Sequence, residues 1–128
     1  MERVKFNLEF LFRSSPAILY QFLTTPSCLI RWFCDGVDIQ GDTYVFLWNG
    51  SAQAAEMIDD IEEELIRFRW LDAEDENEFL EFKIYTSPVT DETVLEITDF
   101  SDADEEEDQK LLWIAQMERL RKEMGAGS

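Results

Sequence analysis

The stretch from residue 104 to residue 124 constrains the fold more than any other, because it has the pattern of a long amphipathic helix. Its large apolar residues recur at intervals of three and four positions, with one more beside them: Trp113, Met117, Leu120, Met124 and Leu112. Acidic residues crowd its start, basic residues lie near its end, and Gly125 follows, as the helix dipole and a glycine stop favour. An apolar stripe of this length needs a partner surface, which we expect the rest of the chain to supply.

The chain before this helix is predicted to be mostly extended. Apolar and polar residues alternate in its first segment, and later segments repeat the pattern between glycine-containing turns. Strands are expected at residues 4–13, 37–40, 43–48, 51–59, 66–70, 80–85 and 93–99. Between the first two strands, Ser15-Pro16 and Thr25-Pro26 each predict the start of a short helix.

The predicted order of elements is strand, two short helices, six strands and a long helix, which defines an α+β fold. Short connections favour an antiparallel meander of about seven strands, and burying one face of each element favours a sheet that curves around the terminal helix. At 128 residues, a single domain over residues 1–128 is expected. Its 10 Phe, 4 Trp and 3 Tyr residues can build a core wide enough to hold a cavity.

The chain is strongly acidic, which excludes some classes of partner. A formal net charge of −18 repels phosphate backbones and anionic head groups, so neither nucleic acid nor a membrane surface is an expected partner. The sequence contains no apolar run of membrane-spanning length and no signal-peptide pattern, so no membrane insertion and a cytoplasmic location are expected.

Metal and cofactor sites are not predicted either. Cys28 and Cys34 are the only cysteines and the chain has no histidine, so neither a zinc site nor a disulfide framework is supported. We expect both thiols to be reduced and to pack in the core. The acidic run over residues 102–108 lacks the central glycine and the final glutamate spacing of a calcium-binding EF-hand loop.

Several local motifs resemble those of a known family. They lie in the predicted short helices, in the strand near residue 68 and in the last helix: Ser15-Pro16, Leu23-Thr24-Thr25-Pro26, Trp32-Phe33, the segment 65–70, Trp113 and Met117-Glu118-Arg119-Leu120. Together with the order of elements they resemble the START-like superfamily, and within it the AHSA-type branch, homologues of an activator of the heat-shock chaperone ATPase. The resemblance implies a helix-grip fold, a curved sheet around a long C-terminal helix. Because these motifs are structural, they specify the fold far better than the activity.

Two features depart from the AHSA-type pattern. Glu92-Thr93 stands where that pattern usually has Gly-Thr before the last strand, and the acidic run over 102–108 replaces the small residues that usually precede the last helix. A compact, strongly acidic START-like family of unassigned role in the Bacteroidetes group is similar in these respects.

No set of residues in the sequence predicts catalysis. Without histidine the ordinary nucleophile–base triads are excluded, and no carboxylate is predicted to lie within an apolar face where burial would raise its pKa. Glu56, between Ala55 and Met57, is the nearest candidate, with a solvent-facing strand position as the alternative. We predict no catalytic residue, and an enzyme of the cyclase or hydrolase type is the least favoured function.

The remaining candidate site is a pocket beneath the long helix, which the helix-grip resemblance implies. Its candidate lining residues are Trp32, Phe33, Phe46, Phe68, Trp70, Phe82, Trp113, Met117 and Leu120. Simple core packing is the alternative for each of them. Tyr44 and Trp48 could join them, but Val45 and Leu47 make the opposite face of that strand equally apolar.

Two main hypotheses for function follow. One is a domain that binds a small hydrophobic or amphipathic ligand in this pocket. The other is an acidic protein-interaction domain, chaperone-associated by analogy of fold. A monomer and a homodimer are both compatible with the sequence.

Overall fold

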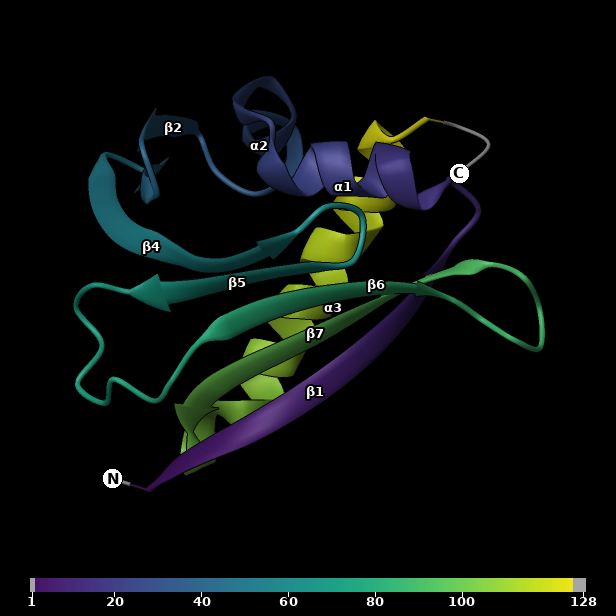
Figure 1. Cartoon of the computed structure of the whole chain (residues 1–128). Coiled ribbons are helices and arrows are strands. Elements are labelled where there is room, and N and C mark those ends of the chain that lie inside the picture. Colours follow the sequence, from purple (N-terminus) through teal and green to yellow (C-terminus); the bar gives the residue numbers. More distant parts are fainter. Residues whose placement is uncertain (1, 126–128) are drawn as a thin grey trace.

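The computed structural model describes residues 2–125, in which an antiparallel sheet curves around a long helix (Figure 1). β1 (Arg3–Phe12) is followed by α1 (Pro16–Thr24) and α2 (Pro26–Trp32). The next strands are β2 (Gly36–Gln40), β3 (Thr43–Trp48), β4 (Ser51–Ile61), β5 (Leu65–Trp70), β6 (Leu80–Thr86) and β7 (Thr93–Asp102). A 3-10 turn, η1 (Ala103–Glu105), leads into α3 (Glu106–Glu123).

The strands form one sheet in the order β1-β7-β6-β5-β4-β3-β2, and all neighbouring pairs are antiparallel. The last strand along the chain therefore lies beside the first, and the strands between them form a meander. The α+β class is confirmed, as are the curved antiparallel sheet, the two short helices after the first strand and the long C-terminal helix.

The two short helices begin at the predicted Ser-Pro and Thr-Pro signals. Ser15 Oγ accepts a hydrogen bond from the backbone N–H of Ile18 at 3.3 Å, which caps α1. The indole N–H of Trp32 donates to the carbonyl oxygen of Phe22 at 2.8 Å and ties α2 to α1. Both helices lie beside the C-terminal end of α3 (Figure 1). None of the helices within residues 2–125 has the length and apolar content needed to cross a membrane.

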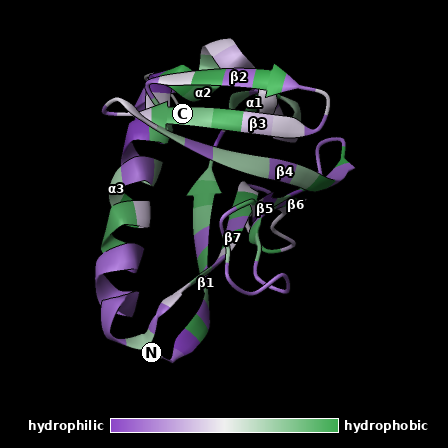
Figure 2. Cartoon of the chain, turned by 90° about the vertical axis from the view of Figure 1, so that its left-hand side faces the viewer, coloured by the Kyte–Doolittle hydropathy of each residue, from purple (hydrophilic) through white to green (hydrophobic). Residues whose placement is uncertain are grey.

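The core lies between α3 and the concave face of the sheet. α3 contributes Trp113, Met117 and Leu120, each at most 5% exposed. Figure 2 shows hydrophilic and hydrophobic segments alternating along this helix. Leu112, predicted beside this stripe, is instead 58% exposed. Successive residues of a helix are separated by about 100° around its axis, so Leu112 lies at the edge of the buried stripe.

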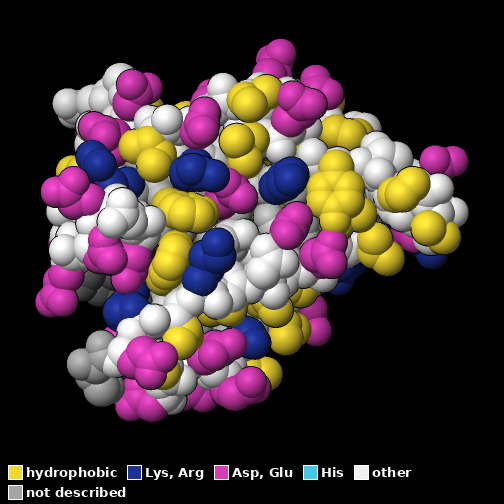
Figure 3. All heavy atoms as spheres, turned by 60° about the horizontal axis from the view of Figure 1, so that its bottom comes forward, with side chains coloured by type: hydrophobic (Ala, Val, Ile, Leu, Met, Phe, Trp, Pro, Cys, Tyr) yellow, Lys and Arg dark blue, Asp and Glu magenta, His cyan; other side chains and the backbone are white. Residues whose placement is uncertain are grey.

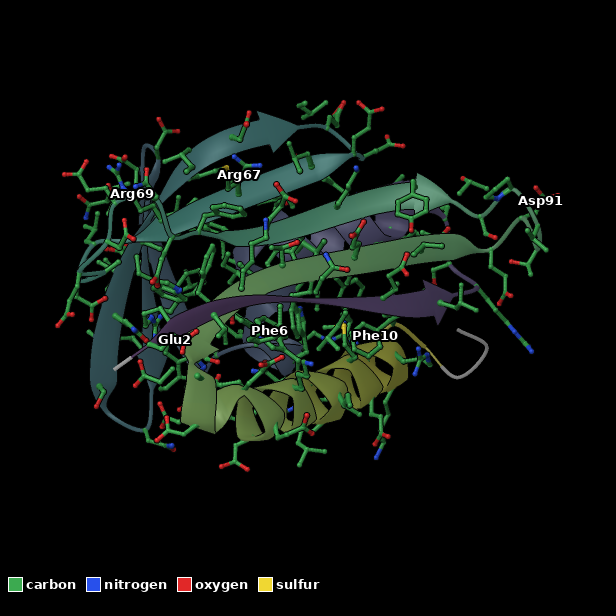
Figure 4. All side chains as sticks on the ribbon, turned by 90° about the horizontal axis from the view of Figure 1, so that it is seen from below. Glu2, Phe6, Phe10, Arg67, Arg69 and Asp91 are labelled. Atoms are coloured by element: carbon green, nitrogen blue, oxygen red, sulfur yellow. The ribbon has the colours of Figure 1, made fainter. Side chains whose placement is uncertain are left out.

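The convex face of the sheet carries charged side chains of both signs (Figures 3 and 4). Arg67 donates to Glu81 across the β5–β6 pair, with Nε 3.0 Å from Oε1. Arg69 pairs with Glu56 of β4 at 3.1 Å, because Glu56 is the residue opposite it in the register. Glu56 therefore occupies a solvent-facing strand position, which was the alternative to a catalytic role for this residue.

The end of the sheet differs from the prediction. β7 was expected to stop at residue 99, but it continues to Asp102, and α3 begins at Glu106 rather than at residue 104. The cause is the neighbouring strand, since β1 begins at Arg3 and Arg3 is paired with Asp102. Pairing with β1 therefore keeps residues 100–102 extended, although the acidic composition of this segment suggested a loop leading into a helix.

Candidate ligand-binding cleft

A cleft of about 1280 Å³ lies between one side of α3 and the concave face of the sheet. Residues of β3, β5 and β7 and the 71–79 loop between β5 and β6 form its other walls. Figure 2 views the molecule from the side on which this loop lies, with α3 along one edge and β3 and β4 above. Ligand pockets commonly measure roughly 300–1000 Å³, so the cleft has room for a drug-sized molecule together with water.

Aromatic rings form one wall of the cleft. The ring centroids of Phe33 and Trp48 are 5.3 Å apart, and those of Trp48 and Trp70 are 6.1 Å apart. On the other side of Phe33, the ring of Trp113 is stacked at 6.3 Å. Pairs of this kind stabilise by about 0.5–1.5 kcal/mol beyond their buried area, so the wall is a connected and rigid apolar surface.

Three of the four indoles are also fixed by hydrogen bonds. Trp48 Nε1 donates to the carbonyl oxygen of Phe33 at 2.6 Å, and Trp113 Nε1 donates to Asp99 Oδ2 at 2.9 Å. Trp32 is held by its bond to α1. Trp70 has no such acceptor among residues 2–125. The cleft wall therefore presents mainly ring surface, because most of its indole N–H groups are used within the protein.

The remaining lining of the cleft is rich in acidic residues. Eight of the lining residues carry carboxyl groups: Asp35, Asp72, Glu74, Asp75, Glu78, Asp99, Asp102 and Glu105. Among the described residues only Arg3 and Arg119 add positive charge to the lining. Arg3 is held by Glu78 at 2.6 Å and by Asp102 at 3.1 Å, so its charge is already matched. The cleft therefore has a strong excess of negative charge.

Asp99 is a functional candidate that the sequence analysis missed. Its Oδ1 accepts from the backbone N–H of Phe100 at 2.8 Å, and its Oδ2 accepts from Trp113. Burial raises the pKa of its carboxyl group, and these two hydrogen bonds counteract part of that shift. The prediction that no carboxylate lies within an apolar face is therefore wrong. The available signal was the alternation of Leu95, Ile97 and residue 99, which places all three on the concave face.

The Trp113 indole should report the ionisation of Asp99. We expect its N–H proton resonance to titrate with a midpoint above the ordinary aspartate value of 3.8, since burial disfavours the charged carboxylate. A titration followed by ¹⁵N-correlated NMR measures this, with the Trp48 indole, which is bonded to a backbone carbonyl, as the internal control. A midpoint at or below 3.8 would contradict the assignment. Because the folded pKa is raised, the contribution of Asp99 to stability is greatest below the unfolded pKa and is lost as pH rises through the folded pKa.

The structure divides the nine predicted site residues into two groups. Trp32, Phe33, Trp70 and Trp113 line the cleft. The others pack in the core and do not line it: Phe46, Phe68, Phe82, Met117 and Leu120. Trp48 also lines the cleft, whereas Tyr44 is buried, and Phe79 and Phe100 are lining residues that were not predicted. Ligand contact by any of these side chains stays a prediction.

The cysteines do not form a reactive site. Burial, with a smaller contribution from the nearby charge of Asp35, raises the pKa of Cys34 to about 11. Its thiol is therefore protonated at neutral pH, although Cys34 belongs to the lining of the cleft. Cys28 is half-buried, and both cysteines are free thiols in the structure.

Three carboxylates gather where β7 passes into α3. One oxygen from each of Asp102, Asp104 and Glu105 lies within 4.8 Å of the others. These atoms could take part in holding a divalent cation, for which carboxylate oxygens are suitable ligands. Asp102 already accepts from Arg3, and acidic residues at this place also suit the positive end of the helix dipole.

Comparisons with known proteins agree with this architecture. The family model of the START-like superfamily domain matches residues 1–126. A Bacteroides fragilis protein with a solution NMR structure is 38% identical, with 98% of this chain and 94% of that chain covered and a TM-score of 0.69. Aha1 from Colwellia psychrerythraea, solved as a dimer, is 20% identical over 98% of both chains, with a TM-score of 0.81.

A Mesorhizobium loti protein is 17% identical, with 94% of this chain and 96% of that chain covered and a TM-score of 0.77. No curated protein matches the chain. The likenesses at 20% and 17% identity concern the fold, whereas the family model and the 38% identical structure identify the family. This chain therefore belongs to the START-like superfamily.

Proposed function

We propose that this domain binds a small amphipathic molecule in the cleft beneath α3. The observation that carries the proposal is the combination of volume and lining, about 1280 Å³ with aromatic rings on one side and polar groups on the other. Ligand sites of proteins have this composition, since ring surface provides apolar contact and a few polar groups fix orientation. The nine residues predicted from the sequence then have two roles, as wall residues and as the core that supports the wall.

An enzymatic function receives less support from the same residues. Cys34 is protonated, and Asp99 accepts hydrogen bonds from both Phe100 and Trp113. Neither group is free to act as a nucleophile or a base without giving up a contact that holds the wall of the cleft. Binding without chemical conversion is therefore the function we favour.

Filling the cleft should abolish binding. Gln116 lines the cleft from α3 and is half-buried, so Gln116→Trp places a large ring in the space that a ligand needs. We expect the affinity for Nile red, a neutral and apolar dye, to fall by tenfold or more in a fluorescence titration. The matched control is Glu118→Trp, an exposed position on the same helix outside the cleft, which should bind the dye like the wild type.

Two results would count against ligand binding in the cleft. One is equal dye affinity of the wild type and Gln116→Trp, with circular dichroism showing both to be folded. The other is the absence of any binding to the wild type, with no rise in its melting temperature, because a ligand of the native state raises stability by RT ln(1 + [L]/Kd).

An acidic protein-interaction domain is the second candidate. Its support is the apolar side chains that α3 exposes outside the cleft, where Leu111 is 60% and Ile114 40% exposed. Exposed apolar side chains on one element are suited to a contact surface. A homodimer is one form of this candidate, and light scattering at increasing concentration distinguishes it by a mass above the 15.1 kDa of one chain.

A further inference from the structure

We propose that the ligand of the cleft is an organic cation, an ammonium or guanidinium group attached to an apolar or aromatic body. This inference rests on the proposed function and adds the sign of the ligand's charge. It follows from three features of the lining: carboxylates without partners, bases that are few or already bound, and half-buried tryptophan rings over which no described Lys or Arg side chain lies.

Negative charge on the rim of the cleft is available to a ligand. Asp72, Glu74 and Glu105 line the cleft and have no hydrogen-bond or ion-pair partner within residues 2–125. Asp72 and Glu74 belong to the 71–79 loop, and Glu105 directly precedes α3. The lining of the cleft therefore draws unpaired carboxylates from two separate segments of the chain.

Positive charge is scarce at the same place. Both acids that hold Arg3, Glu78 and Asp102, belong to the lining, so this guanidinium is not available to an anion without breaking two ion pairs. Arg119 is the only other basic residue that lines the described cleft. An anionic ligand, such as a fatty acid, would face one available base and several like charges, which disfavours its binding.

Ring surface in the cleft is suited to a cation. Trp48 and Trp70 are half-buried at the cleft wall, and no described Lys or Arg side chain lies over their rings. The cation–π contacts of the protein itself lie at Phe rings, for example Arg67 over Phe79 at 4.3 Å. Tryptophan offers the strongest face for a cation, so the rings best suited to this contact are those left open.

The convex face of the sheet is arranged differently. On the convex face of the sheet, Arg67 and Arg69 neutralise Glu81 and Glu56, and basic side chains lie among acidic ones (Figure 3). The negative charge of that face is therefore largely matched by neighbouring residues. In the cleft the unmatched carboxylates lie beside aromatic rings, and this combination of charge and ring surface is what recognises an amphipathic cation.

A matched set of three compounds tests the inference. 4-Phenylbutylamine, 4-phenylbutanol and 4-phenylbutyrate share one apolar body and differ in charge at pH 7. We expect calorimetric titration at low ionic strength to give an affinity for the amine at least tenfold above that for the alcohol, with no detectable binding of the carboxylate. Added salt should reduce the preference, because it screens charges at the rim.

Charge-neutral variants locate the effect. Asp72→Asn with Glu74→Gln should weaken binding of the amine about tenfold while leaving the alcohol unchanged. The control is Glu62→Gln with Glu118→Gln, two exposed acids outside the cleft, which changes the net charge from −18 to −16 in the same way. Equal effects of the two pairs on amine binding would overturn the inference, because only long-range charge would then be involved.

The outcomes separate this inference from the proposed function. If the alcohol or the carboxylate binds as tightly as the amine, or if Nile red binds and the amine does not, the charge assignment is wrong and ligand binding stands. If neither Nile red nor any of the three compounds binds, the proposed function itself fails. A lysine-rich peptide that binds the cleft more tightly than the amine would overturn the small-molecule form of the inference.

Discussion

Trp113→Ala is expected to lower the free energy of unfolding by about 3–5 kcal/mol, the usual cost of removing a buried tryptophan. The side chain is 5% exposed, and its ring packs edge-on against Phe82 at 5.8 Å and is stacked on Phe33. The substitution also leaves Asp99 without its indole donor. Because Trp113 lies midway along α3, this one residue holds much of the helix on the sheet. Urea unfolding followed by circular dichroism measures the change.

A second substitution separates packing from the hydrogen bond. Trp113→Phe keeps an aromatic ring but removes the indole N–H, and we expect a cost of about 1–3 kcal/mol from the smaller ring and from Asp99 Oδ2, which loses its donor. Glu118→Ala, at an exposed position of the same helix, should stay within about 0.5 kcal/mol of the wild type. A cost below about 1 kcal/mol for Trp113→Ala would show that the sheet does not hold α3.

The stripe on α3 could be predicted from the sequence because local and long-range requirements agree there. Trp113, Met117 and Leu120 follow the helical period, and the same spacing that makes a helix amphipathic decides which residues reach the sheet. Strand alternation worked for the same reason in β5, where Ile66 and Phe68 are buried. Period and burial are properties of a short segment, so a short segment suffices to predict them.

The end of β7 could not be predicted in this way. The acidic composition of residues 102–108 indicates a helix start, but pairing with β1 extends the strand to Asp102. The pairing partner lies almost a hundred residues away along the chain, and no local rule contains it. The inward direction of Asp99 follows from the period of two, but its hydrogen bond to Trp113 requires α3 to lie against this end of β7.

The set of residues that lines the cleft could not be predicted from any one segment either. The aromatic residues predicted to line the pocket differ in depth: Phe68 and Phe82 are covered by other rings, whereas Trp70 faces the cleft. Depth depends on how strongly the sheet curves and on where the 71–79 loop lies. The acids of that loop have the composition of a solvated charge run, and only the fold brings them into the lining of the cleft.

Phe46→Ala is expected to have an effect as large as that of Trp113→Ala, although Phe46 does not line the cleft. Its side chain is 1% exposed and lies at the centre of an aromatic cluster. The neighbouring rings have centroids within 6.0 Å of its own: Phe33, Tyr44, Trp48, Phe68 and Trp70. Removing the ring leaves a cavity that this rigid cluster fills poorly, so a loss of about 3–5 kcal/mol is expected in denaturant unfolding.

The same substitution tests whether the core supports the wall of the cleft. Without the ring of Phe46, Trp48 and Trp70 lose the surface that fixes their positions, so Nile red should bind more weakly under conditions where the variant is still folded. Phe46→Leu retains most of the volume and should cost about half as much or less. Leu47→Ala, the next residue of β3 and 42% exposed on the opposite face, should change stability by less than about 1 kcal/mol. Equal losses of stability for Phe46→Ala and Leu47→Ala would contradict this assignment. The face of β3 that carries Phe46 and Trp48 would then not be the one packed on the core, and Trp48 could not belong to the cleft wall.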